Sequence, residues 1–223
     1  MTPVLSAAPQ PTYWLVPSRF PPIGLFDTVA TAADANAVME LAGWTNDRLV
    51  AERIARLPSE QWVYGSPNSS IVMAAFLHVA PGGMRFNGPD LGAWYASAEM
   101  ATAVAEVGHH LRREAAARRV PAMRRIYRNY AAALQGDYVD IRGQADALAG
   151  VLAPDNYTAS QAFTPSLQRE GHSGILYDSV RRRGGTNLAV WKPVNVADVV
   201  QAEHFEISVR AEERHIEVRR LTA

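Results

Sequence analysis

Four strand-like runs follow one another over the last 50 residues of the chain, and this order constrains the fold more than any other feature. The runs are GILYDSV (174–180), NLAVWKP (187–193), HFEISVR (204–210) and HIEVRRL (215–221), with the last closing a hairpin. Helical patterns concentrate earlier, near the middle of the chain. Helices in the middle and strands at the end predict an α+β fold. No repeat of 20 to 50 residues is visible, which argues against solenoids and propellers.

The clearest helical pattern follows the short apolar run AWYAS (93–97), which we interpret as a buried strand. Ser97 is placed to cap a helix that begins near Glu99. The small and apolar residues of that helix recur at steps of three and four and predict one packed face: Ala101, Val104, Gly108, Leu111 and Ala115. Glu106 lies about 200° around the helix from Val104, at 100° per residue. It should therefore point to another surface, and we expect a cleft there.

The N-terminal part of the chain has a different residue pattern from the middle and the C-terminal part. Six prolines in the first 22 residues favour extended or turn backbone, which predicts an arm. Residues 31–57 predict two short helices that separate near Gly43-Trp44, with Thr45 or Asn46 capping the second and Pro58 ending it. The apolar run 69–79 fits a strand or a buried helix, and we favour a helical or mixed structure.

Between these parts, strands are predicted around Ile126 and over 138–142, separated by a turn at 135–137. Residues 157–171 predict a helix that starts near Thr158 or Ser160, contains Pro165 and ends with Gly171.

Composition limits the classes of function. The chain of 223 residues fits one domain, 1–223, in which residues 1–68 form the proline-rich arm and a helical extension packed on the core. Its 22 basic and 22 acidic residues give a formal charge of +0, which disfavours direct nucleic-acid binding. With no cysteine, disulfides and thiolate chemistry are excluded. No run approaches the roughly 18–20 apolar residues of a membrane span, so we expect a cytoplasmic protein.

Three separated blocks resemble the RES-domain family: YWLVPSRFPPIGLF, MRFNGPDLGAWYASAEMATAVAEVGHH and YTASQAFTPSLQREGHSGILYDSVRRRGGTNLAVWKP. They occur in family order and cover much of the chain between Tyr13 and Pro193. The resemblance implies a fold similar to ADP-ribosyltransferases and a toxin that consumes NAD. The arginine, glutamate and serine of the family name fall on Arg85, Glu106 and Ser179.

The resemblance also implies a role for each residue. Catalysis is assigned to Glu106, Arg85, Tyr95 and Ser179, and NAD binding to Arg19, Arg85, Tyr95 and Asn87. Cleavage of the bond between nicotinamide and ribose passes through a ribosyl cation, which a carboxylate such as Glu106 stabilises. Arg85 offers a planar donor fork for phosphate, Tyr95 both a stacking ring and a hydroxyl, and Ser179 a hydroxyl.

Some assignments stay open at this point. Family members commonly carry an arginine directly after the equivalent of Tyr13, where this chain has Trp14, so Arg19 either replaces that arginine or one contact is lost. Each site residue also has an ordinary structural interpretation, such as a good helix former for Glu106. The pair His109-His110 diverges by about 100° on a helix, so we expect no metal site there. The run 181–183 is interpreted as a solvated basic loop.

We therefore expect an NAD glycohydrolase or NAD phosphorylase, with NAD as substrate and no metal. The alternatives are a mono-ADP-ribosyltransferase that modifies a protein and an interaction module that has lost catalysis. The acceptor of ADP-ribose stays open among water, phosphate and protein. The resemblance implies a helix-turn-helix antitoxin as partner, and the oligomer is either a homodimer or a toxin–antitoxin hetero-oligomer.

Overall fold

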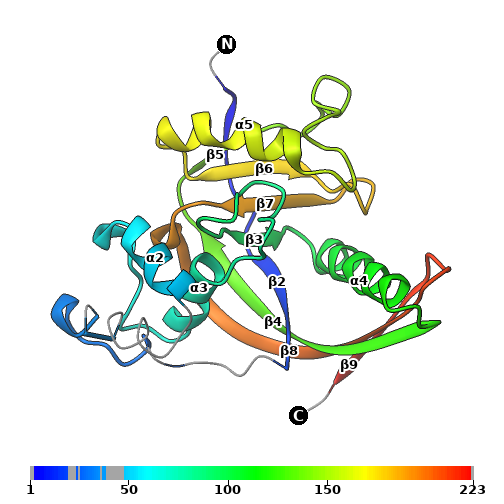
Figure 1. Cartoon of the computed structure of the whole chain (residues 1–223), viewed down its shortest axis with the longest axis horizontal. Coiled ribbons are helices and arrows are strands. Elements are labelled where there is room, and N and C mark those ends of the chain that lie inside the picture. The colour runs from blue at the N-terminus through cyan, green and yellow to red at the C-terminus, as the bar shows by residue number, and fades with distance from the viewer. Residues whose placement is uncertain (1–2, 20–23, 25, 36, 39–47, 222–223) are drawn as a thin grey trace.

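A nine-stranded sheet runs through the protein in the order β1-β5-β6-β7-β3-β2-β4-β8-β9 (Figure 1). The computed structural model describes residues 3–19, 24, 26–35, 37–38 and 48–221. Among the described strands, β5 and β6 pair in parallel and the other neighbours are antiparallel. The strands are β1 Leu5–Ala7, β2 Thr12–Pro17, β3 Trp94–Ser97, β4 Ala122–Leu134, β5 Asp137–Asp140, β6 Gly174–Asp178, β7 Thr186–Val190, β8 Val196–Arg210 and β9 Ile216–Leu221.

Helices cover the sheet from several sides. They are α2 Arg48–Arg56, α3 Ser69–Leu77, α4 Met100–Ala117 and α5 Thr158–Arg169, with short 3₁₀ helices at Ser59–Gln61 and Pro193–Asn195. Figure 1 shows α3 and α4 on either side of β2. Two apolar clusters carry this packing: one joins Phe76 of α3 to Trp94 of β3, and the other joins Leu111 of α4 to Leu15 of β2. Among the described residues, no helix is long and apolar enough to cross a membrane.

The junction between β2 and β3 is the weakest pairing inside the sheet. These two strands are in register only at Tyr13 and Ser97, whereas β2 pairs with β4 over six residues and β3 with β7 over four. Beyond that pair the two strands diverge. We call the space between them the β2–β3 wedge. It divides the sheet into a β1-β5-β6-β7-β3 half and a β2-β4-β8-β9 half.

The predicted α+β fold, with mostly antiparallel strands flanked by helices, is confirmed. The run 69–79 forms α3. This helix is apolar on all sides, which fits the burial of most of its residues. The strands predicted in the last 50 residues appear as β6 to β9, and the turn at 135–137 separates β4 from β5. The proline-rich arm contributes β2, a strand inside the sheet. The predicted helix break and cap at 43–46 lie outside the described residues.

Two details of the central helix differ from the sequence prediction. Ser97 does not cap α4, because its hydroxyl donates to Asn187 Oδ1 at 2.7 Å and Glu99 is the residue before the helix. Ala101 is exposed, and Thr102 and Ala103 take its place in the buried face with Gly108, Leu111 and Ala115. The first turn therefore buries other sides of the helix than the one predicted, since successive residues point about 100° apart. Pro165 lies within α5, and Gly171 follows that helix with φ +84° as predicted for its C′ position.

Candidate functional site

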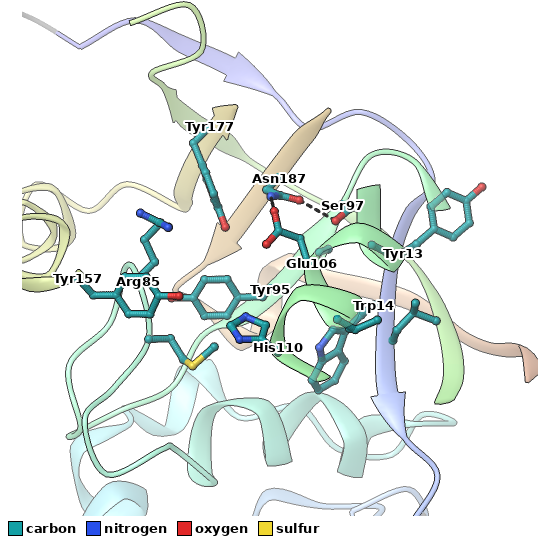
Figure 2. Close-up of a pocket in the computed structure, with 15 residues that line it drawn as sticks. Tyr13, Trp14, Arg85, Tyr95, Ser97, Glu106, His110, Tyr157, Tyr177 and Asn187 are labelled. Atoms are coloured by element: carbon teal, nitrogen blue, oxygen red, sulfur yellow. Dashed lines mark hydrogen bonds between the residues drawn. The ribbon is translucent and has the colours of Figure 1, made fainter. Parts of the chain in front are cut away.

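A cavity of about 200 Å³ opens in the β2–β3 wedge and is walled by α4 (Figure 2). We call it the wedge pocket. Its lining residues come from strands β2, β3, β6 and β7, from helix α4 and from loops: Tyr13, Trp14, Leu15, Met84, Arg85, Tyr95, Ala96, Ser97, Ala103, Glu106, Val107, His110, Tyr157, Tyr177 and Asn187. Four tyrosines and one tryptophan form its walls, and one carboxylate faces it. Ligand sites of this type combine aromatic walls with a few placed polar groups.

Glu106 is held in the wedge pocket by two hydrogen bonds on the same oxygen. Its Oε1 accepts from Ser179 Oγ at 2.7 Å and from Asn187 Nδ2 at 2.6 Å. No described residue donates a hydrogen bond to Oε2. One oxygen of the carboxylate is therefore fixed, and the other remains available to a ligand.

Both donors to Glu106 are themselves oriented. The Ser179 hydroxyl accepts from the backbone N–H groups of Arg181 and Arg182, each at 3.1 Å, so its own proton points at the carboxylate. Asn187 Oδ1 accepts from Ser97 Oγ at 2.7 Å, which fixes the amide with its NH₂ toward Glu106 (Figure 2). The result is a chain of hydrogen bonds across α4, β3, β7 and the loop after β6.

Local sequence explains how these elements meet. Ser97 and Asn187 are paired in the β3–β7 register, so their side chains lie side by side. The loop after β6 approaches α4 closely at Gly185, where a Cβ atom would lie 2.5 Å from Thr102 Oγ1. Glycine at 185 therefore allows Ser179 to reach Glu106 across 73 residues of sequence.

Tyr95 presents its ring to the wedge pocket, and its hydroxyl is used elsewhere. That hydroxyl donates to Asn87 Oδ1 and accepts from the Phe86 N–H, each at 2.8 Å. Burial raises the pKa of Tyr95 well above its usual value, so the phenol is neutral at physiological pH. Of the two roles expected for Tyr95, the geometry fits stacking, since both hydrogen-bonding directions of the hydroxyl are occupied.

Arg85 is buried and binds backbone carbonyls. Its Nη1 donates to the carbonyls of Val151 and Ala153 at 3.2 and 2.7 Å, and its Nη2 donates to that of Pro154 at 3.3 Å. The guanidinium also lies 4.8 Å from the centre of the Tyr157 ring, within the range of a cation–π contact. Arg85 thus anchors the segment that brings Tyr157 to the wedge pocket, while it also lines the pocket itself.

The remaining predicted NAD-binding residues lie outside the wedge pocket lining. Asn87 holds its own loop, donating to the carbonyls of Gly88 and Leu91 as well as accepting from Tyr95. Arg19 is exposed just after β2, and its charge acts on Glu114 and Tyr127 near the far end of α4. Arg19 therefore does not reach the pocket lining, where Trp14 forms an aromatic wall.

The basic loop and the histidine pair meet at Asp155. Arg181 Nη2 lies 3.2 Å and His109 Nε2 lies 3.5 Å from Asp155 Oδ1. Burial, together with the charge of Arg181, lowers the pKa of His109 to about 4, so this histidine is neutral at pH 7. His110 turns the other way on α4 and lines the wedge pocket. Among the described residues, no group of three or more His, Cys, Asp or Glu side chains is placed to hold a metal ion.

Several pocket residues were missed by sequence reasoning. Asn187 and Ser97 orient Glu106, while His110, Tyr157 and Tyr177 complete the walls. One feature of the sequence could have pointed to Asn187, because it is a polar residue at the start of an otherwise apolar strand run. Tyr157 had none, because its place depends on the anchoring of 151–154 by Arg85.

Comparisons with known proteins show what this chain is similar to. A family model described as "RES domain" matches residues 53–210. Among solved structures, the "M.tuberculosis MbcT-MbcA toxin-antitoxin complex" contains a chain with 16% sequence identity and a TM-score of 0.41, aligned over 55% of this chain and 73% of that one. No curated protein matches the chain.

Proposed function

This chain belongs to the RES-domain family, and from that premise we propose that it cleaves the bond between nicotinamide and ribose in NAD⁺. The observation that carries the proposal is the Glu106 carboxylate, fixed through Oε1 by Ser179 and Asn187 and open at Oε2 inside an aromatic pocket. A fixed negative charge in such a pocket is suited to a cation that exists only while a bond breaks.

The chemistry requires little else from the protein. The bond between C1′ of the ribose and N1 of nicotinamide breaks, and nicotinamide leaves as a neutral molecule with the bonding electron pair. The ribose ring is left as an oxocarbenium-like cation. Attack by water forms the new C1′–O bond and releases one proton; attack by phosphate gives the 1″-phosphate instead. No acid is needed to protonate the leaving group, so a single carboxylate suffices.

The proposal assigns roles to residues in the wedge pocket and beside it. Glu106 Oε2 accepts a hydrogen bond from a ribose hydroxyl and stabilises the developing charge. Ser179 and Asn187 act as positioning residues, because their contacts are with Glu106. Tyr95 and Tyr157 offer ring faces to nicotinamide and ribose. Arg85 keeps Tyr157 in place and adds a positive charge, and Asn87 holds the Tyr95 hydroxyl.

The biological setting is proposed from the family alone. A protein that consumes NAD is toxic to the cell that makes it, so we propose a cytoplasmic toxin that an antitoxin protein silences by covering the wedge pocket. Any contact with DNA would belong to a helix-turn-helix antitoxin, since this chain has a formal charge of +0. Arg19 has no place in the proposed chemistry.

Product analysis tests the proposal. Purified protein is incubated with NAD⁺, with and without inorganic phosphate, and the products are separated by chromatography. Free nicotinamide with ADP-ribose in both conditions supports a glycohydrolase, and ADP-ribose-1″-phosphate that depends on phosphate supports a phosphorylase. Radiolabel transferred from NAD⁺ to protein would instead indicate a mono-ADP-ribosyltransferase. An absence of free nicotinamide under all conditions would contradict the proposal and favour an interaction module.

A further inference from the structure

A second and larger cavity adjoins the wedge pocket on the α3 side of β2. Its volume is about 570 Å³, within the ~300–1,000 Å³ typical of sites for small organic ligands. We call it the α3 chamber. It is lined by Trp14, Leu15, Val16, Pro17, Ser70, Ile71, Ala74, Ala75, His78, Val79, Ala80, Met84, Asn87, Gly92, Ala93, Tyr95 and Arg128.

The two cavities share part of their walls. Trp14 and Leu15 of β2, Met84, and Tyr95 of β3 line both. These residues stand on the two sides of the β2–β3 wedge, which has a single pair of residues in register. A ligand held at Glu106 therefore lies next to the chamber. The wedge pocket alone, at about 200 Å³, is smaller than the usual ligand site.

The chamber wall is suited to a flat, apolar base. The side chains contributed by α3 include Ile71, Ala74 and Ala75, which leave room because two of them are alanines. Trp14 is held by aromatic packing, with its ring centre 4.4 Å from that of Trp94 and 6.4 Å from that of Tyr130. A tryptophan fixed in this way offers a ring for stacking at little cost in side-chain entropy.

The chamber also carries a positive charge. Arg128 of β4 is 4% exposed and contributes to the lining. Among the described residues that line the chamber there is no aspartate or glutamate. An apolar, aromatic space with one cation and no acid matches a purine nucleotide, which joins a planar base to an anionic phosphate.

We propose that the α3 chamber binds the adenylate half of the dinucleotide whose nicotinamide end lies in the wedge pocket. This inference rests on the proposed function and adds a substrate-specificity site to it. Trp14, which lines both cavities, serves here as the stacking wall between the two halves. The chamber accounts for a preference for the complete dinucleotide over nicotinamide mononucleotide, which lacks adenylate.

The test fills the chamber and compares substrates. Ala74→Phe places a ring in the chamber, at a residue that lines the chamber and not the wedge pocket, and Ala117→Phe at the exposed end of α4 is the matched control. For the parent and the control, we expect kcat/KM for NAD⁺ to exceed that for nicotinamide mononucleotide by at least about tenfold. Ala74→Phe should remove that advantage through the NAD⁺ value, and the mononucleotide value should stay within about twofold of the parent.

Calorimetric titration of the full chain with AMP provides a second readout that does not depend on catalysis. We expect AMP to bind the parent and the control, to compete with NAD⁺, and to lose at least about tenfold in affinity in Ala74→Phe. A milder variant, Ala74→Leu, answers the question if thermal melting shows that Ala74→Phe is unfolded.

The outcomes separate this inference from the proposed function. If NAD⁺ is cleaved but the mononucleotide is an equal substrate and AMP does not bind, the chamber proposal is wrong and the proposed function stands. If neither substrate is cleaved but AMP binds the parent and not Ala74→Phe, the proposed function is wrong and the chamber remains a nucleotide site. Loss of antitoxin binding in Ala74→Phe, with AMP binding absent in the parent, would overturn the proposal and assign the chamber to a protein side chain.

Discussion

The Ser179 hydroxyl donates a 2.7 Å hydrogen bond to Oε1 of Glu106, although 73 residues separate them in the chain. Serine in this position accepts from two backbone N–H groups, so its single proton is directed to the carboxylate. The structure therefore directs the serine hydroxyl to Glu106, and we propose that Ser179 acts through this carboxylate. This geometry predicts how substitutions of Glu106 and of its two donors, Ser179 and Asn187, change the activity.

Ser179→Ala removes one of the two donors to Glu106. We expect kcat to fall about tenfold, equivalent to ~1.4 kcal/mol, with little change in the KM for NAD⁺, because the serine orients a group that acts in the transition state. Ser166→Ala, at an exposed serine of α5, should keep parental kinetics. A Ser179→Ala enzyme with an unchanged kcat and a raised KM would assign the hydroxyl to substrate binding instead.

Asn187→Asp replaces the second donor by a carboxylate of the same shape, 2.6 Å from Glu106. Like charges at this distance disfavour the ionised form of one partner. The acidic limb of the kcat–pH profile should therefore move to higher pH, with activity regained as pH rises. Asn156→Asp, at an exposed residue before α5, serves as the control. A parental pH profile in Asn187→Asp would contradict the close contact between the side chains at 187 and 106.

Arg85→Lys keeps the charge but loses the planar fork that holds the carbonyls of Val151, Ala153 and Pro154. Lysine has three donors around one nitrogen and cannot span the same set. We expect a loss of ~1–3 kcal/mol in the free energy of unfolding, from buried carbonyls left without donors, and a higher KM for NAD⁺ because Tyr157 is no longer fixed. Chemical denaturation and steady-state kinetics measure the two effects.

The exposed Arg183 provides the matched control, since Arg183→Lys makes the same change outside the pocket. A change in KM without any loss of stability in Arg85→Lys would indicate that Arg85 contacts the substrate phosphate and that its carbonyl bonds are unimportant.

The lowered pKa of His109 predicts how the free energy of unfolding depends on pH. Its pKa is lowered to about 4 in the folded protein, chiefly by burial and then by Arg181, against an ordinary value near 6.5. Between these two values the unfolded chain binds a proton that the folded chain does not, so stability falls as pH decreases from about 6.5 to about 4. His109→Gln should lose less stability than the parent between pH 7 and pH 5, by on the order of 1 kcal/mol.

Denaturant midpoints at the two pH values provide the measurement, and the exposed His215→Gln is the control. Equal losses in His109→Gln and in the parent would contradict the role assigned to burial of this histidine.

The sequence predicted the fold class and most of the strands because apolar runs and turn residues are local signals. The α3 run was ambiguous between strand and helix, since a segment that is apolar all round has no periodicity to separate the two. Ser97 was wrongly predicted to cap α4, because the local sequence does not show its hydrogen-bond partner. Its true partner, Asn187, is 90 residues away and meets it only through the β3–β7 register.

The site was predicted less completely than the fold. Family resemblance named Arg85, Tyr95, Glu106 and Ser179, which the structure brings to the wedge pocket and its edge. It could not show that Arg85 binds carbonyls or that the Tyr95 hydroxyl is occupied, because both depend on the tertiary path of residues 86–87 and 151–154. Arg19 was chosen for proximity to Trp14 in sequence, and the strand that separates them carries it away from the pocket.

The most direct measurement of the central claim is nicotinamide release from NAD⁺ by the parent and by Glu106→Gln. Glutamine preserves the volume and can still accept at one oxygen, so the variant should keep its fold and much of its NAD⁺ affinity while it loses the negative charge. We expect kcat to fall roughly a hundredfold, equivalent to ~3 kcal/mol of transition-state stabilisation, with a much smaller change in KM. A Glu106→Gln protein that releases nicotinamide at the parental rate would contradict both the site and the mechanism.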